Sequence, residues 1–411
     1  MHTIRGVALG DATSFRDGVL TVEAAAAEDL LAADALAEVR LDWASPGSRV
    51  RIVKVLDAVE PRTKGSGGGG IFPGFVGPPE PQGTGETHVL RGAVVVTAGF
   101  LPRAQEGLVD MTGPGQQLSF LGATHNLVVG FAPAEDAPWE EVDRALRRGA
   151  LRLAAHLAEA ALDHEPDAVE DLSGVGDATG PELPRVAAVT NLQTQGTFKD
   201  VFVYGESFGS DAPALIDPNE LDDGAVVSGQ YGHPALKNPT YTLQNHPIVA
   251  ALRARHGTDL FFGGVVICPE PVDQKGKEKT AQQVADLCRA EGFDAAILTK
   301  EGGGNADADV SLKMDALEEA GIAAVGLFPE MSGPDGSAPP LVIAPNQASA
   351  LVSTGNYDHR IELPAMERAL GGDELALLGV DATSEITVPA AVVYCSCSPI
   401  GLGRLTCREA A

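Results

Sequence analysis

Polar side chains follow five short apolar segments in the second half of the chain, at the point where each segment ends. The segments are predicted strands, and they span residues 186–190, 260–268, 295–299, 323–328 and 351–353. The residues that follow them include Asn191, Gln193, Gln195, Glu270, Glu301, Asn305, Asp307, Asp309, Glu330 and Asn356. Any one of them has a local explanation, such as the capping of the next helix by Asp307 or Asp309. Five groups in succession indicate a ligand site, because open parallel sheets bind ligands beyond the carboxyl ends of their strands.

The segment 301–305 (EGGGN) adds a second indication of such a site. Its three glycines allow a ligand to approach the backbone closely at a helix N-terminus, which suits a carboxylate. The spacing is not that of a G-x-G-x-x-G fingerprint, so a nicotinamide cofactor is not supported.

A further concentration of polar residues lies at 237–246 (KNPTYTLQNH), before a helix that is predicted to begin near Pro247. Its members are Asn238, Thr240, Tyr241, Gln244 and Asn245. One interpretation is local, with Asn245 as the helix cap and the rest as a turn. The other is that these side chains line a pocket.

Two domains are predicted to position these residues. Residues 181–411 alternate the strands above with helices at 277–291 and 309–320, which is typical of a mostly parallel, doubly wound α/β sheet. Residues 1–180 are β-rich, with strands at 48–59, 89–98 and 126–131 and one long helix at 138–164. The Gly- and Pro-rich stretch 65–85 is predicted to be a surface loop or a lid.

Composition restricts the class of protein. The chain has 411 residues, with 29 Lys and Arg against 57 Asp and Glu, for a formal net charge of −28. Such a surface repels nucleic-acid phosphates and anionic membranes. The chain has no apolar run of the roughly 20 residues that a membrane helix needs. With no leader pattern, and with five cysteines that do not form a disulfide framework, we expect a cytoplasmic protein.

Many ordered blocks of sequence resemble one known family. The chain is similar to the proprotein (alpha/beta) subunit of component B of glycine, sarcosine and betaine reductases, and more distantly to the D-proline reductase proprotein. The blocks are VRIVKVLDAVEPR (50–62), GIFPG (70–74), THVLRGAVVVTAG (87–99), QEGLVDMTGPG (105–115), LQTQG (192–196), DGAVVSG (223–229), KNPTYTLQNHP (237–247), LRARHGTDL (252–260), EGGGN (301–305), GNYDHRIELPAME (355–367) and GLGRLTCREA (401–410).

The resemblance implies an enzyme of reductive amino-acid metabolism. In the family, the precursor cleaves itself before an internal cysteine, which becomes a pyruvoyl group. That carbonyl forms a Schiff base with the substrate amine, and a thiol- or selenol-bearing partner subunit then attacks the alpha carbon. The C–N bond is broken reductively.

This chain departs from the family at the cleavage position. Alignment without a gap between the blocks at 223–229 and 237–247 places the cleaved cysteine at Ala235. Alanine has no β heteroatom, so it cannot support the acyl shift or the elimination that yields a pyruvoyl group. We therefore expect no cofactor, unless cleavage is displaced to Ser228 or Thr240. Imine chemistry at Lys237 or Lys300 is a further alternative.

A second departure is Cys395-Ser396-Cys397. On a strand, the two thiols point to the same side, at about 7 Å from each other. They are predicted to be ordinary buried residues, a redox dithiol that replaces part of the family's thiol chemistry, or metal ligands; the spacing does not match a structural zinc site, and no metal is expected.

The resemblance also implies roles within the site. The predicted catalytic residues are Glu301, Asn305, Asp307 and Tyr241, and the predicted substrate-binding residues are Gln193, Gln195, Asn238, Gln244 and Asn356. The leading hypothesis is a divergent component B-like subunit that binds a small amino acid or amine for reductive C–N cleavage or a related transfer, in an oligomer with a second thiol- or selenol-bearing subunit. The alternatives are a non-catalytic assembly or binding paralogue, and a biosynthetic enzyme with different carbonyl or thiol chemistry.

Overall fold

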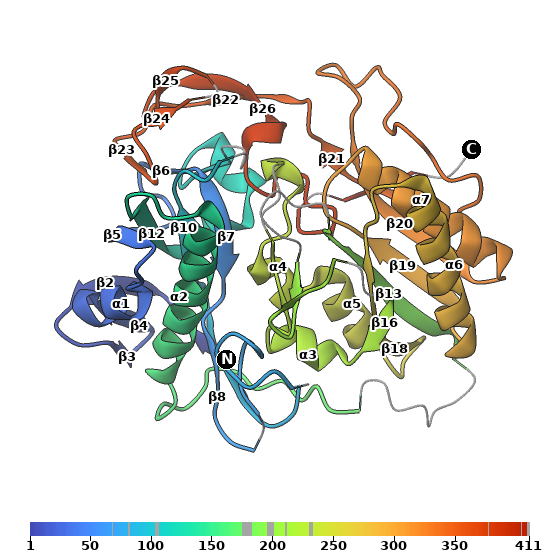
Figure 1. Ribbon diagram of the computed structural model, residues 1–411, viewed down its shortest axis with the longest axis horizontal. Coiled ribbons are helices and arrows are strands. Elements are labelled where there is room, and N and C mark those ends of the chain that lie inside the picture. Colours follow the sequence, from blue (N-terminus) through green and yellow to red (C-terminus); the bar gives the residue numbers. More distant parts are fainter. Residues whose placement is uncertain are drawn as a thin grey trace.

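The computed structural model describes the chain except for residues 68, 81–82, 103–106, 175–182, 195–200, 210–211, 230–232, 377, 404 and 409–411. In Figure 1 the first half of the chain lies on one side and the helix-covered sheet of the second half on the other. The elements of the first half are β1 (His2–Thr3), β2 (Gly6–Gly10), β3 (Ser14–Arg16), β4 (Val19–Glu23), α1 (Ala24–Leu31), β5 (Leu36–Ala44), β6 (Val50–Val53), β7 (Val55–Val59), β8 (Arg62–Lys64), β9 (Thr87–Arg91), β10 (Ala93–Ala98), β11 (Leu108–Asp110), β12 (His125–Pro133) and α2 (Trp139–Glu159).

The second half begins with the large sheet and continues into a set of short strands. Its elements are β13 (Arg185–Leu192), β14 (Phe202–Val203), β15 (Glu206–Ser207), β16 (Ala214–Ile216), α3 (Pro218–Asp222), β17 (Val226–Val227), α4 (Thr240–Gln244), α5 (Pro247–Arg255), β18 (Phe261–Pro269), α6 (Gln274–Ala290), β19 (Ala295–Thr299), α7 (Asn305–Glu319), β20 (Ala323–Glu330), β21 (Ala350–Asn356), β22 (Arg360–Leu363), β23 (Arg368–Leu370), β24 (Glu374–Leu375), β25 (Val380–Asp381), β26 (Ile386–Pro389) and β27 (Thr406–Arg408).

The largest sheet has seven strands in the order β16-β18-β13-β19-β20-β21-β27. Its five central strands are parallel, and the two edge strands run antiparallel to their neighbours. The first of the parallel strands in the chain, β13, lies between the second and the third, so the strand order reverses between β13 and β19. That reversal is a topological switch point, the place where doubly wound sheets bind ligands.

Both faces of this sheet are covered, because its buried strands are apolar on both sides. Val186 and Ala188 of β13 pack in a core with α5, whereas Ala187 and Val189 pack in another core with α6 and α7. Figure 1 shows α6 and α7 on the outer side of the sheet and α5 on the inner side. The predicted mostly parallel, doubly wound α/β fold is confirmed.

The main sheet of the first half has the order β5-β12-β10-β7, and α2 packs against it. Helix α2 begins after Pro138, with Glu140 and Glu141 in its first turn, where carboxylates favour the helix dipole. One face of this helix, from Val142 to Ala158, is buried in the core. The predicted helix at 138–164 exists and ends five residues earlier than expected.

The predicted strand at 48–59 is two strands that belong to different sheets. Strand β6 pairs with β11 and β23, whereas β7 pairs with β10. The chain turns at Lys54, whose φ is +55°. A side chain at positive φ interrupts the strand conformation, and this local break is not visible in the apolar alternation.

The described part of the Gly- and Pro-rich stretch 65–85 packs against the second half of the chain. Phe72 is fully buried, and its backbone N–H donates to Asp223 O at 2.8 Å. A Cβ at Gly74 would lie 2.1 Å from Tyr204 O, so this contact requires glycine. The described part of this stretch is therefore a loop that is packed against the second half of the chain.

The chain returns to the first half near its end. Strand β23 pairs in parallel with β6, and buried Arg51 bonds Asp110 at 2.5 and 3.0 Å as well as Ala382 O at 3.0 Å.

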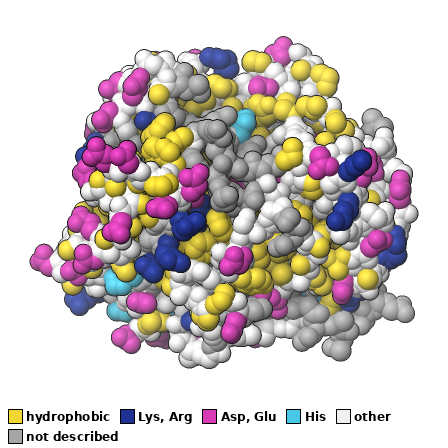
Figure 2. Space-filling model, in the orientation of Figure 1, with side chains coloured by type: hydrophobic (Ala, Val, Ile, Leu, Met, Phe, Trp, Pro, Cys, Tyr) yellow, Lys and Arg dark blue, Asp and Glu magenta, His cyan; other side chains and the backbone are white. Residues whose placement is uncertain are grey.

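The two-domain boundary at residue 180 remains a prediction. On the face in Figure 2, Asp and Glu side chains are spread over the surface. In the described part of the chain, no helix is long and apolar enough to span a bilayer.

Candidate functional site

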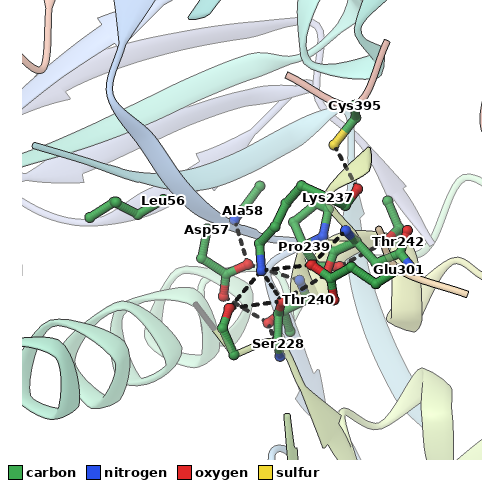
Figure 3. A network of polar contacts seen from close by, with 12 residues as sticks. Leu56, Asp57, Ala58, Ser228, Lys237, Pro239, Thr240, Thr242, Glu301 and Cys395 are labelled. Atoms are coloured by element: carbon green, nitrogen blue, oxygen red, sulfur yellow. Dashed lines mark hydrogen bonds and ion pairs between the residues drawn. The ribbon is translucent and has the colours of Figure 1, made fainter. Parts of the chain in front are cut away.

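A buried lysine, Lys237, lies at the carboxyl edge of the seven-stranded sheet, where it pairs with Glu301 after β19. Figure 3 shows this lysine and the polar side chains around it. The Nζ atom of Lys237 is 2.6 Å from Ser228 Oγ, 2.6 Å from Gly229 O and 3.2 Å from Glu301 Oε1. Glu301 follows β19 by two residues, and its Oε1 also accepts the N–H of Asn238 at 3.2 Å. We call Lys237, Glu301, Ser228, Asp57 and Thr240 the lysine cluster.

Within the lysine cluster, Asp57 and Thr240 link the first half of the chain to the second half. Asp57 of β7 accepts the N–H of Thr240 at 2.9 Å and its hydroxyl at 2.8 Å. Ser228 N–H donates to Thr240 Oγ1 at 3.1 Å, and Ser228 Oγ donates to Asn238 O at 2.7 Å. Asp57 therefore binds the N-terminal end of α4, where the backbone N–H groups have no partner within the helix and favour an anion.

Burial sets the electrostatics of the lysine cluster. None of its five residues is more than 7% exposed. Burial raises the pKa of Asp57 and of Glu301, and in both the Lys237 ammonium opposes the rise. Removing one member of a buried ion pair leaves an uncompensated charge, at a cost of about 3–5 kcal/mol.

Further buried ion pairs line the same edge. Lys300 pairs with Asp307, and Lys313 pairs with Asp309. Asp307 Oδ2 also accepts Gly304 N–H at 2.6 Å, so it closes the first turn of α7. Burial, with Asp309 adding to the effect, raises the pKa of Glu270 to about 8. Asp307, a predicted catalytic residue, is thus already paired with a lysine.

A histidine marks the switch point itself. His246 Nε2 is 3.0 Å from Thr190 Oγ1 on β13 and 3.3 Å from Thr299 Oγ1 on β19. Burial lowers the pKa of His246 to about 3, so the ring is neutral. The junction between α4 and α5 is thereby held over the carboxyl ends of both strands.

The turn that contains Cys395 and Cys397 packs on the backbone around Ala235. Cys395 N–H donates to Pro234 O at 2.9 Å, Cys397 N–H donates to Ala235 O at 3.1 Å, and Cys395 Sγ is 3.4 Å from Lys237 O. Ala235 is fully buried. Burial raises the pKa of both thiols, that of Cys397 to about 11. Protonated, buried thiols are poor nucleophiles.

Two other side chains of α4, Tyr241 and Gln244, face another environment. The ring of Tyr241 stacks on Phe120 with centroids 4.4 Å apart. Burial raises the pKa of Tyr241 to about 12, and Glu60 adds to the rise. Gln244 Oε1 accepts the N–H of Glu60 at 3.0 Å. The polar segment 237–246 is therefore divided between two sites, and Tyr241 and Gln244 are not part of the lysine cluster.

The structure separates the remaining predicted site residues. Gln193 is buried after β13, and Gln195 lies outside the described residues. Asn305 is exposed at the first position of α7. Asn356 Nδ2 donates to Gly333 O at 2.8 Å and its Oδ1 accepts Asp358 N–H at 3.0 Å, so it ties two loops together. The roles assigned to these residues remain predictions.

Sequence reasoning missed Asp57 as a member of the site. It also treated Ser228 only as a possible displaced cleavage position. A carboxylate inside the apolar strand 55–59 is unusual, since an unpaired buried charge is costly, and that was the signal available for Asp57. Among the described residues, no three His, Cys, Asp or Glu side chains are grouped to hold a metal ion.

Doubly wound α/β folds bind ligands at the switch point, and this chain has buried ion pairs there. The chain belongs to the family of glycine/sarcosine/betaine reductase component B subunits, whose family model matches residues 1–405. It is 38% identical over 373 residues to the glycine reductase complex component B subunits alpha and beta of Peptoclostridium acidaminophilum, covering 90% of this chain and 87% of that protein.

Two further relatives come from the same organism. The sarcosine reductase complex component B subunit alpha is 34% identical over 375 residues, covering 90% of this chain and 87% of the relative. The betaine reductase complex component B subunit alpha is 33% identical over 434 residues, covering 99% of this chain and 98% of the relative. No solved structure matches the chain.

Proposed function

We propose that the chain is the small-molecule-binding subunit of a component B-like reductase and that it works without a pyruvoyl group. Its substrate is a small amino acid or amine, bound at the carboxyl edge of the seven-stranded sheet. A separate thiol- or selenol-bearing subunit supplies the nucleophile. Its sulfur or selenium bonds to the alpha carbon as the C–N bond breaks and the amine leaves, so the carbon group passes to that subunit. Reductive release of the carbon group takes two electrons from a second thiol of that subunit.

One observation carries the amine specificity: the lysine cluster has two carboxylates and one lysine. Lys237 pairs with Glu301, whereas Asp57 is held by the backbone and hydroxyl of Thr240. The nearby guanidinium of Arg147 is paired with Asp143 at 2.9 Å. An ammonium group that enters this site balances the second carboxylate, and in a low-dielectric environment that interaction is strong.

The residues present do not fit a pyruvoyl group at the position where the family forms it. Ala235 carries no hydroxyl or thiol, and its carbonyl accepts the N–H of Cys397. The hydroxyls considered for displaced cleavage are both engaged, with Ser228 donating to Asn238 O and Thr240 donating to Asp57. These contacts support an uncleaved chain.

The lysine alternative is less well supported. Lys300 is bonded to Asp307 and to Gly302 O at 2.7 Å, and Lys237 is bonded to Glu301 and two further acceptors. A lysine amine forms an imine only with a carbonyl compound, so this route requires a carbonyl substrate in place of an amine.

The intact mass of the purified chain, with and without a carbonyl-trapping hydrazine, tests the absence of the pyruvoyl group. We expect one species at 42.4 kDa with no adduct. Two fragments, of which the C-terminal one reacts with hydrazine, would contradict the proposal and place cleavage at another residue.

Binding of the amine is tested by calorimetry with glycine, sarcosine and betaine. We expect at least one of them to bind, and Asp57→Asn to weaken that binding at least tenfold because the ammonium loses the carboxylate that it balances. Glu319→Gln on the far end of α7 is the matched control. Equal binding by both variants would contradict the assigned site.

A second candidate function is a non-catalytic assembly paralogue. The burial of every member of the lysine cluster favours it, since a substrate must reach its site. No binding of any of the three amines, together with tight complex formation with a thiol- or selenol-bearing subunit, would favour this candidate. Product analysis with candidate amines and thiols would identify the third possibility, a biosynthetic enzyme that uses the same pocket without reduction.

A further inference from the structure

A cavity of about 1020 Å³ lies between the two halves of the chain, beside the C-terminal end of α4. Gln244, Asn245 and His246 line it on one side, and Arg62 and Arg91 of the first half line it on the other. Helix α4 has five residues, so this wall is roughly 7 Å along the helix from Thr240 of the lysine cluster. The size is that of a small-molecule site.

The buried and half-buried charges around the cavity do not balance. The cations are Arg62, Lys64, Arg91, Arg253 and the N-terminal ammonium of Met1, and the carboxylates are Glu60, Asp222 and Asp223. Asp222 pairs with Arg253 at 2.7 Å, and Asp223 pairs with Lys64 at 2.5 Å. Glu60, which is fully buried, is shared by Arg62 at 2.7 Å and Arg91 at 2.8 Å. Two guanidinium groups therefore depend on one carboxylate.

Arg91 is held by protein partners and lines the cavity. Its Nη1 donates to Glu60 Oε1 at 2.8 Å and to Asn245 Oδ1 at 2.6 Å. Its Nη2 is 3.8 Å from the thioether of Met1, which is a weak acceptor, and its side chain also hydrogen-bonds the side chain of Tyr241. The side chain is 41% exposed, so a ligand can reach it.

Arg62, by contrast, is saturated. Its donors reach Glu60, Asp222 O, Gln244 O and Asn245 Oδ1, and its side chain is 4% exposed. Arg62 therefore holds Glu60 and Asn245 in place, whereas the guanidinium of Arg91 is fixed by Glu60 and Asn245 and is partly exposed to the cavity. A guanidinium N–H that is held in this way donates a charge-assisted hydrogen bond to an oxyanion.

The acidic residues at the cavity mouth limit the size of the ligand. Glu86, Glu170 and Asp171 line the cavity, but all three are exposed to solvent. Water and salt screen such charges from the inner wall, and the same charges repel long polyanions. A compact molecule with a single anionic group satisfies both conditions.

We propose that this cavity binds a small molecule through a carboxylate or phosphate oxyanion held by Arg91, with Asn245 positioned beside it. The site is separate from the lysine cluster, and the proposal does not rest on the reductase function. It assigns a ligand to a chain whose overall negative charge otherwise disfavours anions.

The test is equilibrium binding to the full chain in an oxyanion-free chloride buffer. Acetate, butyrate and hexanoate are compared with acetamide, butyramide and hexanamide, which match them in size but carry no charge, and with inorganic phosphate. We expect saturable binding of at least one oxyanion and none of the amides. Arg91→Gln weakens it at least tenfold, and Arg91→Lys, which keeps the charge but loses the guanidinium, weakens it less.

The matched control is Arg255→Gln, because Arg255 is an exposed arginine paired within its own helical region. Binding of carboxylates alone or of phosphate alone supports the proposal and identifies the group recognised. Equal response to acids and amides, or the same affinity in Arg91→Gln as in the unmodified chain, overturns it. Each variant's thermal unfolding is recorded, so a loss of binding is separated from a loss of structure.

Discussion

The charged residues around the two ends of α4 differ in how their charges and hydrogen-bonding groups are paired. At the N-terminal end, Lys237 and Asp57 are closed off from solvent and their polar atoms have protein partners. At the C-terminal end, Arg91 is partly exposed to the cavity. Saturated buried networks give rigidity, because each member is costly to remove, whereas binding requires donors that a ligand can reach. The polar segment 237–246 thus contributes both to the buried lysine cluster and to the accessible wall of the cavity.

The largest predicted effect is on stability at the lysine cluster. Lys237→Met leaves Glu301 buried without its cation, so we expect a loss of about 3–5 kcal/mol in the free energy of unfolding. Urea denaturation measures it, with Lys275→Met on the exposed face of α6 as the control, expected within about 0.5 kcal/mol of the unmodified chain. A loss below about 1 kcal/mol for Lys237→Met would show that the pair does not form.

The second prediction is that the stability of the protein depends on pH through Glu270, which lies buried at the edge of the sheet. The folded pKa of Glu270 is about 8, above its unfolded value, so the folded state binds more protons than the unfolded state between roughly pH 4.5 and 8. Its contribution to stability is therefore full below pH 4.5 and is lost as pH rises toward 8, with a size on the order of a few kcal/mol.

The measurement is the difference in unfolding free energy between the unmodified chain and Glu270→Gln across that pH range. We expect the difference to fall steadily as pH rises, because glutamine does not titrate. A difference that does not change with pH would mean that Glu270 titrates normally and that this edge of the sheet is hydrated.

A smaller effect is expected at the cavity. Arg91→Gln removes a half-exposed partner of Glu60, which keeps its bonds to Arg62, so the loss should stay near or below about 1 kcal/mol. Thermal unfolding with and without added salt measures it. If Arg91→Gln lowered the free energy of unfolding as much as Lys237→Met does, the two ends of α4 would not differ in the way described.

The smallest expected effect is a lack of reaction. Cys268, Cys288, Cys395 and Cys397 are buried, so we expect none of them to react with a thiol-alkylating reagent in the folded protein and all of them to react in denaturant. Peptide mapping by mass spectrometry identifies each site. Rapid alkylation of Cys395 or Cys397 in the folded state would instead support the redox hypothesis for this pair.

The sheet and its helices were largely predictable from the sequence. The apolar runs at 186–190, 260–268 and 295–299 correspond to β13, β18 and β19, because buried parallel strands are continuously apolar. The break at Lys54 was not predictable, since it depends on a single positive φ inside an otherwise regular alternation. Alternation reports which residues are buried, and it does not report which sheet a strand joins.

The site was predictable in its parts and not in its assembly. Asn238 and Glu301 were singled out as polar residues of the segments 237–246 and 301–305, and Lys237 as a candidate for imine chemistry, and the three do meet. Asn356 was singled out in the same way but connects loops through Gly333 and Asp358. A polar residue at a strand end has the same sequence signature whether it faces a ligand or a neighbouring turn.

The sequence by itself determined the family, the alternation of strands and helices, and the absence of a nucleophile at residue 235. These are properties of residue identity and local periodicity, which need no partner from elsewhere in the chain. Only the tertiary structure decided that Asp57 joins Lys237 and that Tyr241 belongs with Arg91. Such pairings link residues more than a hundred positions apart, and they depend on how β7 and α4 pack across the two halves of the molecule.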